Sequence, residues 1–248
     1  MSASPGLFIN ACKHILIYLY KKKQVALVLD QIKKKYGTID ALRGISVALK
    51  AGEVVGLLGP NGAGKSTLMK ILTGSVEQWD GTITYKGADL RDSLKSIQQR
   101  TGYLPENNPL YEELYVLEYL QFTASLYKIK NPPLASIIEQ VGLTEFKNRK
   151  IETLSKGYQQ RLGIAAALLH DPEILILDEP TTGLDPNQMV EIRKLIRSLG
   201  EDKIVILSSH ILSEVESICD RVLIIKEGKL VADKNLDELR KGQQQIIL

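Results

Sequence analysis

The sequence predicts an α/β fold with a mostly parallel core sheet flanked by helices, together with an antiparallel β part and a helical subdomain. Short apolar runs alternate with stretches of helical periodicity along most of the 248 residues. A glycine-rich turn joins one of these runs to a helix, and acidic or polar residues directly follow others. Such alternation favours a parallel sheet covered on both faces, with ligands at the carboxyl ends of its strands.

The first elements are strands. Runs at 25–33 and 45–49 precede a short buried strand at 53–58, and a helix is expected at 66–72 after the glycine-rich turn. A strand at 81–86 lies between two turn signals and is expected to be antiparallel to its neighbours.

The middle of the chain is predicted to be helical. Apolar residues recur near a 3.6-residue period at 111–127, and two shorter helices are expected at 134–141 and 157–169. We therefore expect a helical subdomain at about 107–163 inside a larger domain of residues 25–240.

The α/β alternation then returns. Asp185 and Pro186 are expected to start a helix, because aspartate accepts backbone N–H bonds at an N-cap and proline fits the first turn. The expected elements are, in order, a strand at 173–177, that helix to about Ser198, a strand at 203–208, a helix at 211–219, and a hairpin of 221–226 with 229–232.

The two ends of the sequence lie outside this pattern. Residues 1–24 are interpreted as an N-terminal leader, which is a poorly ordered extension, an interfacial helix or a short anchor, and 241–248 as a tail. No run of about 18 apolar residues occurs, so no standard spanning helix is expected. A transporter built on this chain would need a separate membrane subunit.

The composition excludes some functions. The formal net charge of +3 is too small to favour a nucleic-acid partner. The two cysteines, Cys12 and Cys219, are far apart in the sequence, which indicates a reducing compartment and gives no metal-site pattern.

The glycine-rich turn carries the first chemical prediction. It fits the phosphate-loop pattern G-x-x-x-x-G-K-[ST], and its residues are Gly59, Pro60, Asn61, Gly62, Ala63, Gly64, Lys65, Ser66 and Thr67. Backbone N–H groups and a helix N-terminus can cradle an anion there. Lys65 is then expected to reach the β- and γ-phosphates of a nucleoside triphosphate, and the Ser66 hydroxyl to ligate Mg²⁺.

Two acids follow the apolar run at 174–177. Asp178 suits a Mg²⁺ ligand, and Glu179 suits the group that orients an attacking water. The alternative is an ordinary strand that ends in solvated acids.

A further anion site is indicated at 154–161, where Ser155 begins a helix. The alternative is a plain helix N-cap. One complete triphosphate loop has no use for another phosphate site, unless that site serves a second copy of the protein.

Taken together, these segments resemble the nucleotide-binding subunit of ABC transporters over residues 25–239. The fold class is then the P-loop NTPase of ABC ATPase type. The matching motifs are Walker A at 59–67, the signature at 154–161, Walker B at 174–179, the D-loop at 183–186, the switch histidine at 208–210, and Tyr36 at the adenine-stacking position.

The resemblance implies a role for each site residue. The cofactors would be ATP and Mg²⁺, with Mg²⁺ held by Ser66, Asp178 and Glu106. Glu179 would be the general base, and Lys65 and His210 would stabilise the transferring charge. Ser155, Gly157 and Tyr158 of a second subunit would complete the site, in a homodimer or in a dimer with a paralogous ATPase subunit.

Two residues depart from the family pattern. Lys156 stands where the signature usually has glycine, so that it either adds charge at the γ-phosphate or is solvated. Glu106 stands at the usual glutamine of the Q-loop, which keeps an oxygen ligand but loses the amide donor. His14 and His170 are interpreted as structural.

With both departures, the chain resembles subunits of ABC-2 exporters. Within these it is most similar to gliding-motility-associated and multidrug-export ATPases. The expected partner is an integral-membrane permease, gripped near Glu106 and the helix from Tyr111, at the cytoplasmic face of the inner membrane. The alternatives are a soluble ABC-type ATPase that acts on nucleic acid or ribosomes, and a metabolic P-loop kinase.

Overall fold

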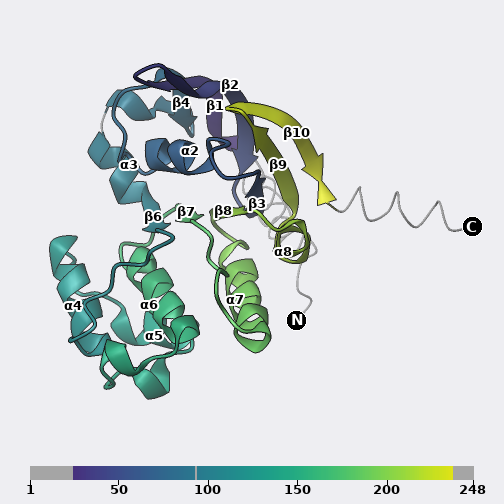
Figure 1. Cartoon of the computed structure of the whole chain (residues 1–248). Coiled ribbons are helices and arrows are strands. Elements are labelled where there is room, and N and C mark those ends of the chain that lie inside the picture. The colour runs from purple at the N-terminus through teal and green to yellow at the C-terminus, as the bar shows by residue number, and fades with distance from the viewer. Residues whose placement is uncertain (1–24, 93, 237–248) are drawn as a thin grey trace, which may run out of the picture.

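The computed structural model describes residues 25–92 and 94–236. The predicted leader at 1–24 and the predicted tail at 241–248 lie outside these residues. Two β-sheets organise the described part, one of four strands and one of six. Figure 1 shows the smaller sheet at the top of the molecule and the helix-rich part at the bottom.

The four-stranded sheet has the order β2-β1-β4-β5 and is antiparallel throughout. Its strands are β1 (Val25–Tyr36), β2 (Ile39–Lys50), β4 (Asp80–Tyr85) and β5 (Ala88–Asp89). The antiparallel strand expected at 81–86 is thereby confirmed. The strand expected at 45–49 is only one part of β2, because residues 39–44 also pair with β1, although only Leu42 among them is buried.

The six-stranded sheet has the order β10-β9-β3-β8-β7-β6. Its strands are β3 (Glu53–Leu58), β6 (Thr101–Leu104), β7 (Ile174–Leu177), β8 (Ile204–Ser209), β9 (Arg221–Lys226) and β10 (Lys229–Asn235). Every neighbouring pair from β9 to β6 is parallel, and only β10 is antiparallel. The predicted mostly parallel core sheet is therefore confirmed.

The sequence reading missed β6 and the helix before it, α3 (Leu94–Arg100). The strand has only four residues, one of them Gly102, so no alternating or continuous apolar pattern marks it. It forms because it pairs with the fully buried β7. This pairing places the chain from Pro105 onward at the same sheet edge as the residues that follow β7.

The helices form layers on either side of the six-stranded sheet. Helix α2 (Lys65–Leu72) lies between the two sheets, where Leu68, Met69 and Ile71 are buried in a core shared with both. The other face is covered by α7 (Pro186–Leu199), α8 (Leu212–Ile218) and the helical segment described next. Short 3₁₀ turns occur at Leu90–Asp92, Thr144–Phe146 and Ile151–Thr153.

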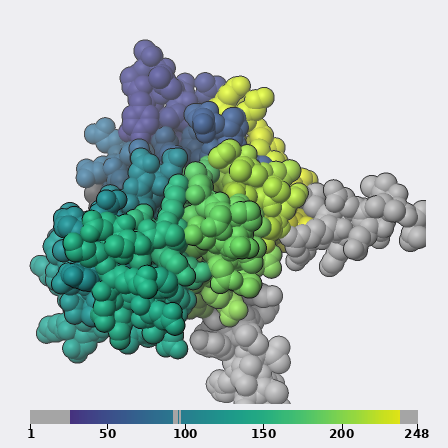
Figure 2. Space-filling model, turned by 60° about the horizontal axis from the view of Figure 1, so that its bottom comes forward, coloured from purple at the N-terminus to yellow at the C-terminus, as the bar shows by residue number. Residues whose placement is uncertain are grey.

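The helical segment contains α4 (Val116–Leu126), α5 (Leu134–Gln140) and α6 (Lys156–Leu168). Figure 2 shows it in teal and green as a lobe in front of the strand-rich part. No helix in the described ranges is both long and apolar enough to cross a bilayer.

Hydrogen bonds to nearby side chains determine where α4 and α7 begin. The helix expected at 111–127 begins only at Val116, because the Glu118 carboxylate accepts the Tyr115 N–H and ends the preceding loop there. The Asp185 prediction is confirmed: its carboxylate accepts the Gln188 backbone N–H at 2.9 Å, with Pro186 in the first turn.

Candidate functional site

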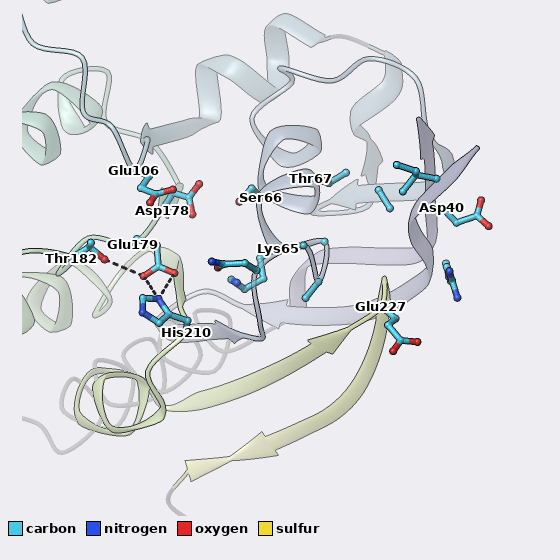
Figure 3. A pocket seen from close by; sticks show the side chains of 17 residues that line it. Asp40, Lys65, Ser66, Thr67, Glu106, Asp178, Glu179, Thr182, His210 and Glu227 are labelled. Carbon is cyan, nitrogen blue, oxygen red and sulfur yellow. Dashed lines mark hydrogen bonds and ion pairs between the residues drawn. The ribbon is translucent and has the colours of Figure 1, made fainter. Parts of the chain in front are cut away.

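A cavity of about 630 Å³ lies at the carboxyl ends of the parallel strands. Segments far apart in the sequence line it, as Figure 3 shows. Its lining residues are Ile39, Asp40, Ala41, Arg43, Asn61, Gly62, Ala63, Gly64, Lys65, Ser66, Thr67, Glu106, Asp178, Glu179, Thr182, His210 and Glu227. The structure thus brings the glycine-rich loop, both strand-end acids, Glu106 and His210 together.

The glycine-rich loop has a backbone that other residues would not tolerate. Gly64 has φ +111°, and a Cβ atom there would lie 2.7 Å from the Ala41 carbonyl oxygen. Helix α2 starts at the next residue, so its first N–H groups have no carbonyl partner in the helix. They face the cavity together with the helix dipole, which favours an anion.

Lys65 is held beneath this loop. Its ammonium donates to the Gly59 carbonyl oxygen at 2.7 Å and to the Pro60 carbonyl oxygen at 3.3 Å, and the residue is only 7% exposed. Gly59 and Pro60 do not line the cavity, and instead hold the Lys65 charge where an anion in the loop would meet it.

Ser208 connects the two acids that follow β7. Its hydroxyl donates to Oδ1 of Asp178 at 2.6 Å and accepts the backbone N–H of Glu179 at 2.9 Å. All three residues are buried. The alternative of solvated acids is therefore wrong, because both carboxylates are built into a polar network at the cavity wall.

Glu179 is held in an unusual conformation. Its φ is +49°, which non-glycine residues rarely adopt and which clusters at functional sites. The carboxylate accepts the Thr182 hydroxyl at 3.2 Å and lies 3.1–3.2 Å from Nδ1 of His210. The side chain therefore points from the end of β7 into the cavity, between two polar partners (Figure 3).

A third buried carboxylate, that of Glu214, supports these loops from behind. Glu214 on α8 is 5% exposed, and its Oε2 accepts the hydroxyls of Thr181 and Ser209 at 2.9 and 2.8 Å. Thr181 follows the Glu179 segment and Ser209 precedes His210, so one carboxylate holds both loops. Sequence reasoning missed Glu214, Thr182 and the Ser208 hydroxyl, although the serine pair that ends the run from 203 was a signal for the last.

Glu106 lies at the junction of two cavities. It lines the large cavity and also a smaller one of about 250 Å³ that Lys156 lines too. Burial, with the negative charges of Asp178 and Glu106, raises the pKa of Tyr103. The oxygens that sequence reasoning assigned to a metal, from Ser66, Asp178 and Glu106, all line the large cavity. Within the described ranges no cluster of three or more His, Cys, Asp or Glu side chains could hold a metal by itself.

Tyr36 is not among the residues that line the cavity. It is 45% exposed, and the Lys34 ammonium lies 4.9 Å from its ring centroid. Ile39 and Arg43, from the following strand, line that end of the cavity instead, and sequence reasoning gave no signal for them.

The signature residues also lie outside the cavity. Ser155 is the N-cap residue of α6, but its side chain accepts no backbone N–H of that helix. Its Oγ instead accepts a hydrogen bond from Gln188 at 3.0 Å. Lys156 is exposed, whereas the ring of Tyr158 packs against Phe146 with centroids 4.0 Å apart.

The family model described as "ABC transporter" matches residues 42–182. The chain belongs to the ABC transporter family. This match spans the phosphate loop, the signature segment and both acids. The predicted ABC ATPase fold and the predicted ATPase class are thereby confirmed, and the kinase alternative is wrong.

Curated relatives agree. The uncharacterized ABC transporter ATP-binding protein YdbJ of Bacillus subtilis is 39% identical over 89% of this chain and 72% of its own length. The linearmycin resistance ATP-binding protein LnrL of the same organism is 42% identical over 82% of this chain and 67% of its own length. The lantibiotic transport ATP-binding protein SrtF of Streptococcus pyogenes is 38% identical, covering 88% and 96%.

Solved structures show the same fold. That of cbiO1 from Clostridium perfringens, described as part of an ABC transporter complex, has a TM-score of 0.80 at 28% identity and covers 90% of this chain and 94% of its own. A dimeric ATP-binding cassette in a post-hydrolysis state, bound to ADP and Pi, has a TM-score of 0.74 at 27% identity and covers 85% and 98%.

Proposed function

We propose that this ATPase hydrolyses ATP at a site shared by two head-to-tail copies, and that the cycle powers export through a separate membrane permease. One observation carries the proposal. Lys65, Asp178, Glu179 and His210 converge on one cavity, whereas the anion-binding segment at Ser155 lies outside it. A second subunit is the simplest source of the missing phosphate contacts.

Glu179 is the general base of this proposal. Its carboxylate would accept a proton from the water that attacks the γ-phosphate, while the hydrogen-bonded His210 and Thr182 hold it in place. Its buried, strained position supports the role, because such a conformation persists only where the surroundings over-determine it. His210 would also contact the γ-phosphate.

The phosphates would lie in the glycine-rich loop. Lys65 would exchange its carbonyl partners for the β- and γ-phosphate oxygens, and its burial would strengthen that attraction. The donors in the cavity fit Mg²⁺, which prefers oxygen ligands, keeps several waters and binds few protein groups. Ser66 and Asp178 would hold it, since Ser208 engages only one of the two Asp178 oxygens, and Glu106 would contribute directly or through water.

The partner copy would supply Ser155 and Gly157. This arrangement gives each dimer two ATP sites, each made from the loop of one subunit and the signature segment of the other. The dimeric solved cassette, similar in fold, supports it. Tyr36 and Tyr158 stay predictions as nucleotide contacts, because the first does not line the cavity and the second packs on Phe146. A paralogous ATPase subunit could replace the second copy.

An apolar surface on the helical lobe suits the membrane partner. Tyr111, Phe122, Leu126 and Tyr127 are each at least 41% exposed and line a common hollow of about 370 Å³ on α4. Large exposed apolar side chains that gather in one place mark interaction sites. We assign this surface to the permease, at the cytoplasmic face of the inner membrane. Two relatives, named for lantibiotic transport and for linearmycin resistance, support export.

Affinity purification of the tagged chain from detergent-solubilised host membranes tests this assignment. A polytopic membrane protein should co-purify with the wild type, and be lost when Tyr111→Ser and Phe122→Ser are combined. Val231→Ser, which changes an exposed apolar residue on β10, is the matched control and should keep the partner. A double variant that retains the partner as well as the control would contradict the docking surface.

A further inference from the structure

Gln188 fixes the hydroxyl of Ser155 from within the same chain. Its side-chain Nε2 donates to Ser155 Oγ at 3.0 Å. Its backbone N–H donates to the capping carboxylate of Asp185 at 2.9 Å. This bond fixes the backbone of Gln188 in the first turn of α7, from which its side chain extends to Ser155. The contact with Ser155 does not follow from the motif patterns, because the two residues are 33 positions apart in the sequence.

The Gln188 side chain also explains why residue 157 is a glycine. A Cβ atom on Gly157 would lie 2.7 Å from Cδ, 2.9 Å from Oε1 and 3.0 Å from Cγ of Gln188, and these are its three nearest atoms. Gly157 lies inside α6 and is buried. Within this chain, therefore, the glycine makes room for Gln188, in addition to any approach of the backbone to a phosphate.

Lys156 makes a second contact with the same region. The three atoms nearest to a Cβ on Gly183 are Nζ, Cε and Cδ of Lys156. The signature segment thus packs against both ends of the stretch from Gly183 to Gln188. Its position is set by its own subunit, before any second copy is considered.

We propose that Gln188 is a positioning residue that orients the Ser155 hydroxyl toward the terminal phosphate of ATP on the second copy. A serine hydroxyl has one proton and two acceptor positions. The Gln188 amide donates to Ser155 Oγ, so one acceptor position of this hydroxyl is used within its own subunit. The hydroxyl proton is then directed to an acceptor outside the subunit. A phosphate oxygen is such an acceptor. The inference rests on the proposed shared site.

Two variants separate this role from simple packing. Gln188→Leu keeps the approximate shape but removes the donor, and should lower kcat by about 2- to 10-fold, the value of one hydrogen bond. An ionised glutamate can only accept hydrogen bonds, so in Gln188→Glu the Ser155 hydroxyl would donate to residue 188 instead of to the phosphate. The variant would also place a negative charge beside the phosphate. Its kcat should fall by about 10- to 100-fold, because bonds that involve a charged group are stronger.

The controls use the same turn of α7. Asn187→Leu, an exposed neighbour, should leave kcat unchanged. Both Gln188 variants should keep the thermal midpoint of the wild type and the ATP affinity of the isolated chain, since the phosphate loop is untouched. If Gln188→Glu equals or exceeds Gln188→Leu in kcat, the hydroxyl is not directed as proposed and the inference is overturned.

A double-mutant cycle tests the Gly157 contact. Gly157→Ala should lower kcat about 2- to 10-fold more in the wild type than in a Gln188→Ala background, because the atoms that the new Cβ meets are absent from the second. Equal losses in both backgrounds would mean that Gly157 does not serve Gln188.

The shared site is tested apart from Gln188. Equal amounts of Lys65→Ala and Ser155→Ala chains are mixed, and their ATPase activity is compared with the mean of the separate activities. Recovery on mixing, together with a fully active Gln188→Glu variant, overturns the inference and leaves the shared site standing. No recovery overturns the shared site itself.

Discussion

The cavity wall and the signature segment are built differently. At the wall, Asp178 and Glu179 are buried. The Asp178 carboxylate accepts the Ser208 hydroxyl, the Glu179 carboxylate accepts the Thr182 hydroxyl, and the Glu179 N–H donates to Ser208. At the signature segment, Ser155 and Lys156 are exposed, and they contact the start of α7 and the stretch before it.

This difference separates two kinds of task. Residues of the wall are held by segments of one chain and can carry out proton and metal chemistry in a fixed arrangement. Residues of the signature segment are oriented by their own chain but do not line its large cavity, which suits a surface that acts on another molecule. A variant of the wall should therefore lower turnover at the ATP site of its own subunit. A variant of the signature segment should lower turnover at the ATP site of the second subunit in the dimer.

The largest effect is expected from the wall. Glu179→Gln should lower kcat by about 10²–10⁴-fold, because the amide cannot accept the proton from water. Binding of ATP, measured by calorimetry, should remain. Glu201→Gln, which changes an exposed acid outside the cavity, should be fully active. Near-normal turnover of Glu179→Gln would remove it as the base.

The phosphate loop comes next. Lys65→Ala should weaken ATP binding by about 10- to 100-fold, since hydrogen bonds to charged groups contribute about 1.5–3 kcal/mol. Calorimetric titration measures this change, and Lys229→Ala, an exposed lysine of β10, serves as the control. Unchanged affinity would show that the ammonium stays on the Gly59 and Pro60 carbonyls when nucleotide binds.

The smallest effect tests how the wall is held. Ser208→Ala leaves the buried Glu179 N–H and the Asp178 oxygen without their common partner. The free energy of unfolding should fall by about 1–3 kcal/mol, as measured by urea denaturation. Ser198→Ala is the control, because that hydroxyl bonds only to the Leu195 carbonyl in its own helix. Equal losses for both serines would contradict the bridging role of Ser208.

Sequence patterns identified the parts of the wall but not how they connect. The glycine-rich loop, the apolar run of β7 and the two acids were predictable because each is a local pattern. The Ser208 bridge was not, since it joins residues 29 and 30 positions apart in the sequence. The positive φ of Glu179 was equally hidden, because that conformation is normally a property of glycine.

The missed elements have a related cause. Strand β6 is too short to show periodicity and depends on its pairing with β7, yet it delivers Glu106 to the cavity. Tyr36 was assigned to the nucleotide by its position in a family pattern, whereas the structure lines that end of the cavity with Ile39 and Arg43. At the signature segment, motif matching named Ser155 and Gly157 but not Gln188, which contacts both.

The central claim is that each ATP site is made by two chains, and the mixing experiment tests it most directly. In a mixed dimer of Lys65→Ala and Ser155→Ala chains, one site combines both defects and the other combines the intact loop with the intact signature segment. Random pairing would make about a quarter of all sites intact. The account predicts ATPase activity clearly above the mean of the two separate variants. Activity equal to that mean would contradict it.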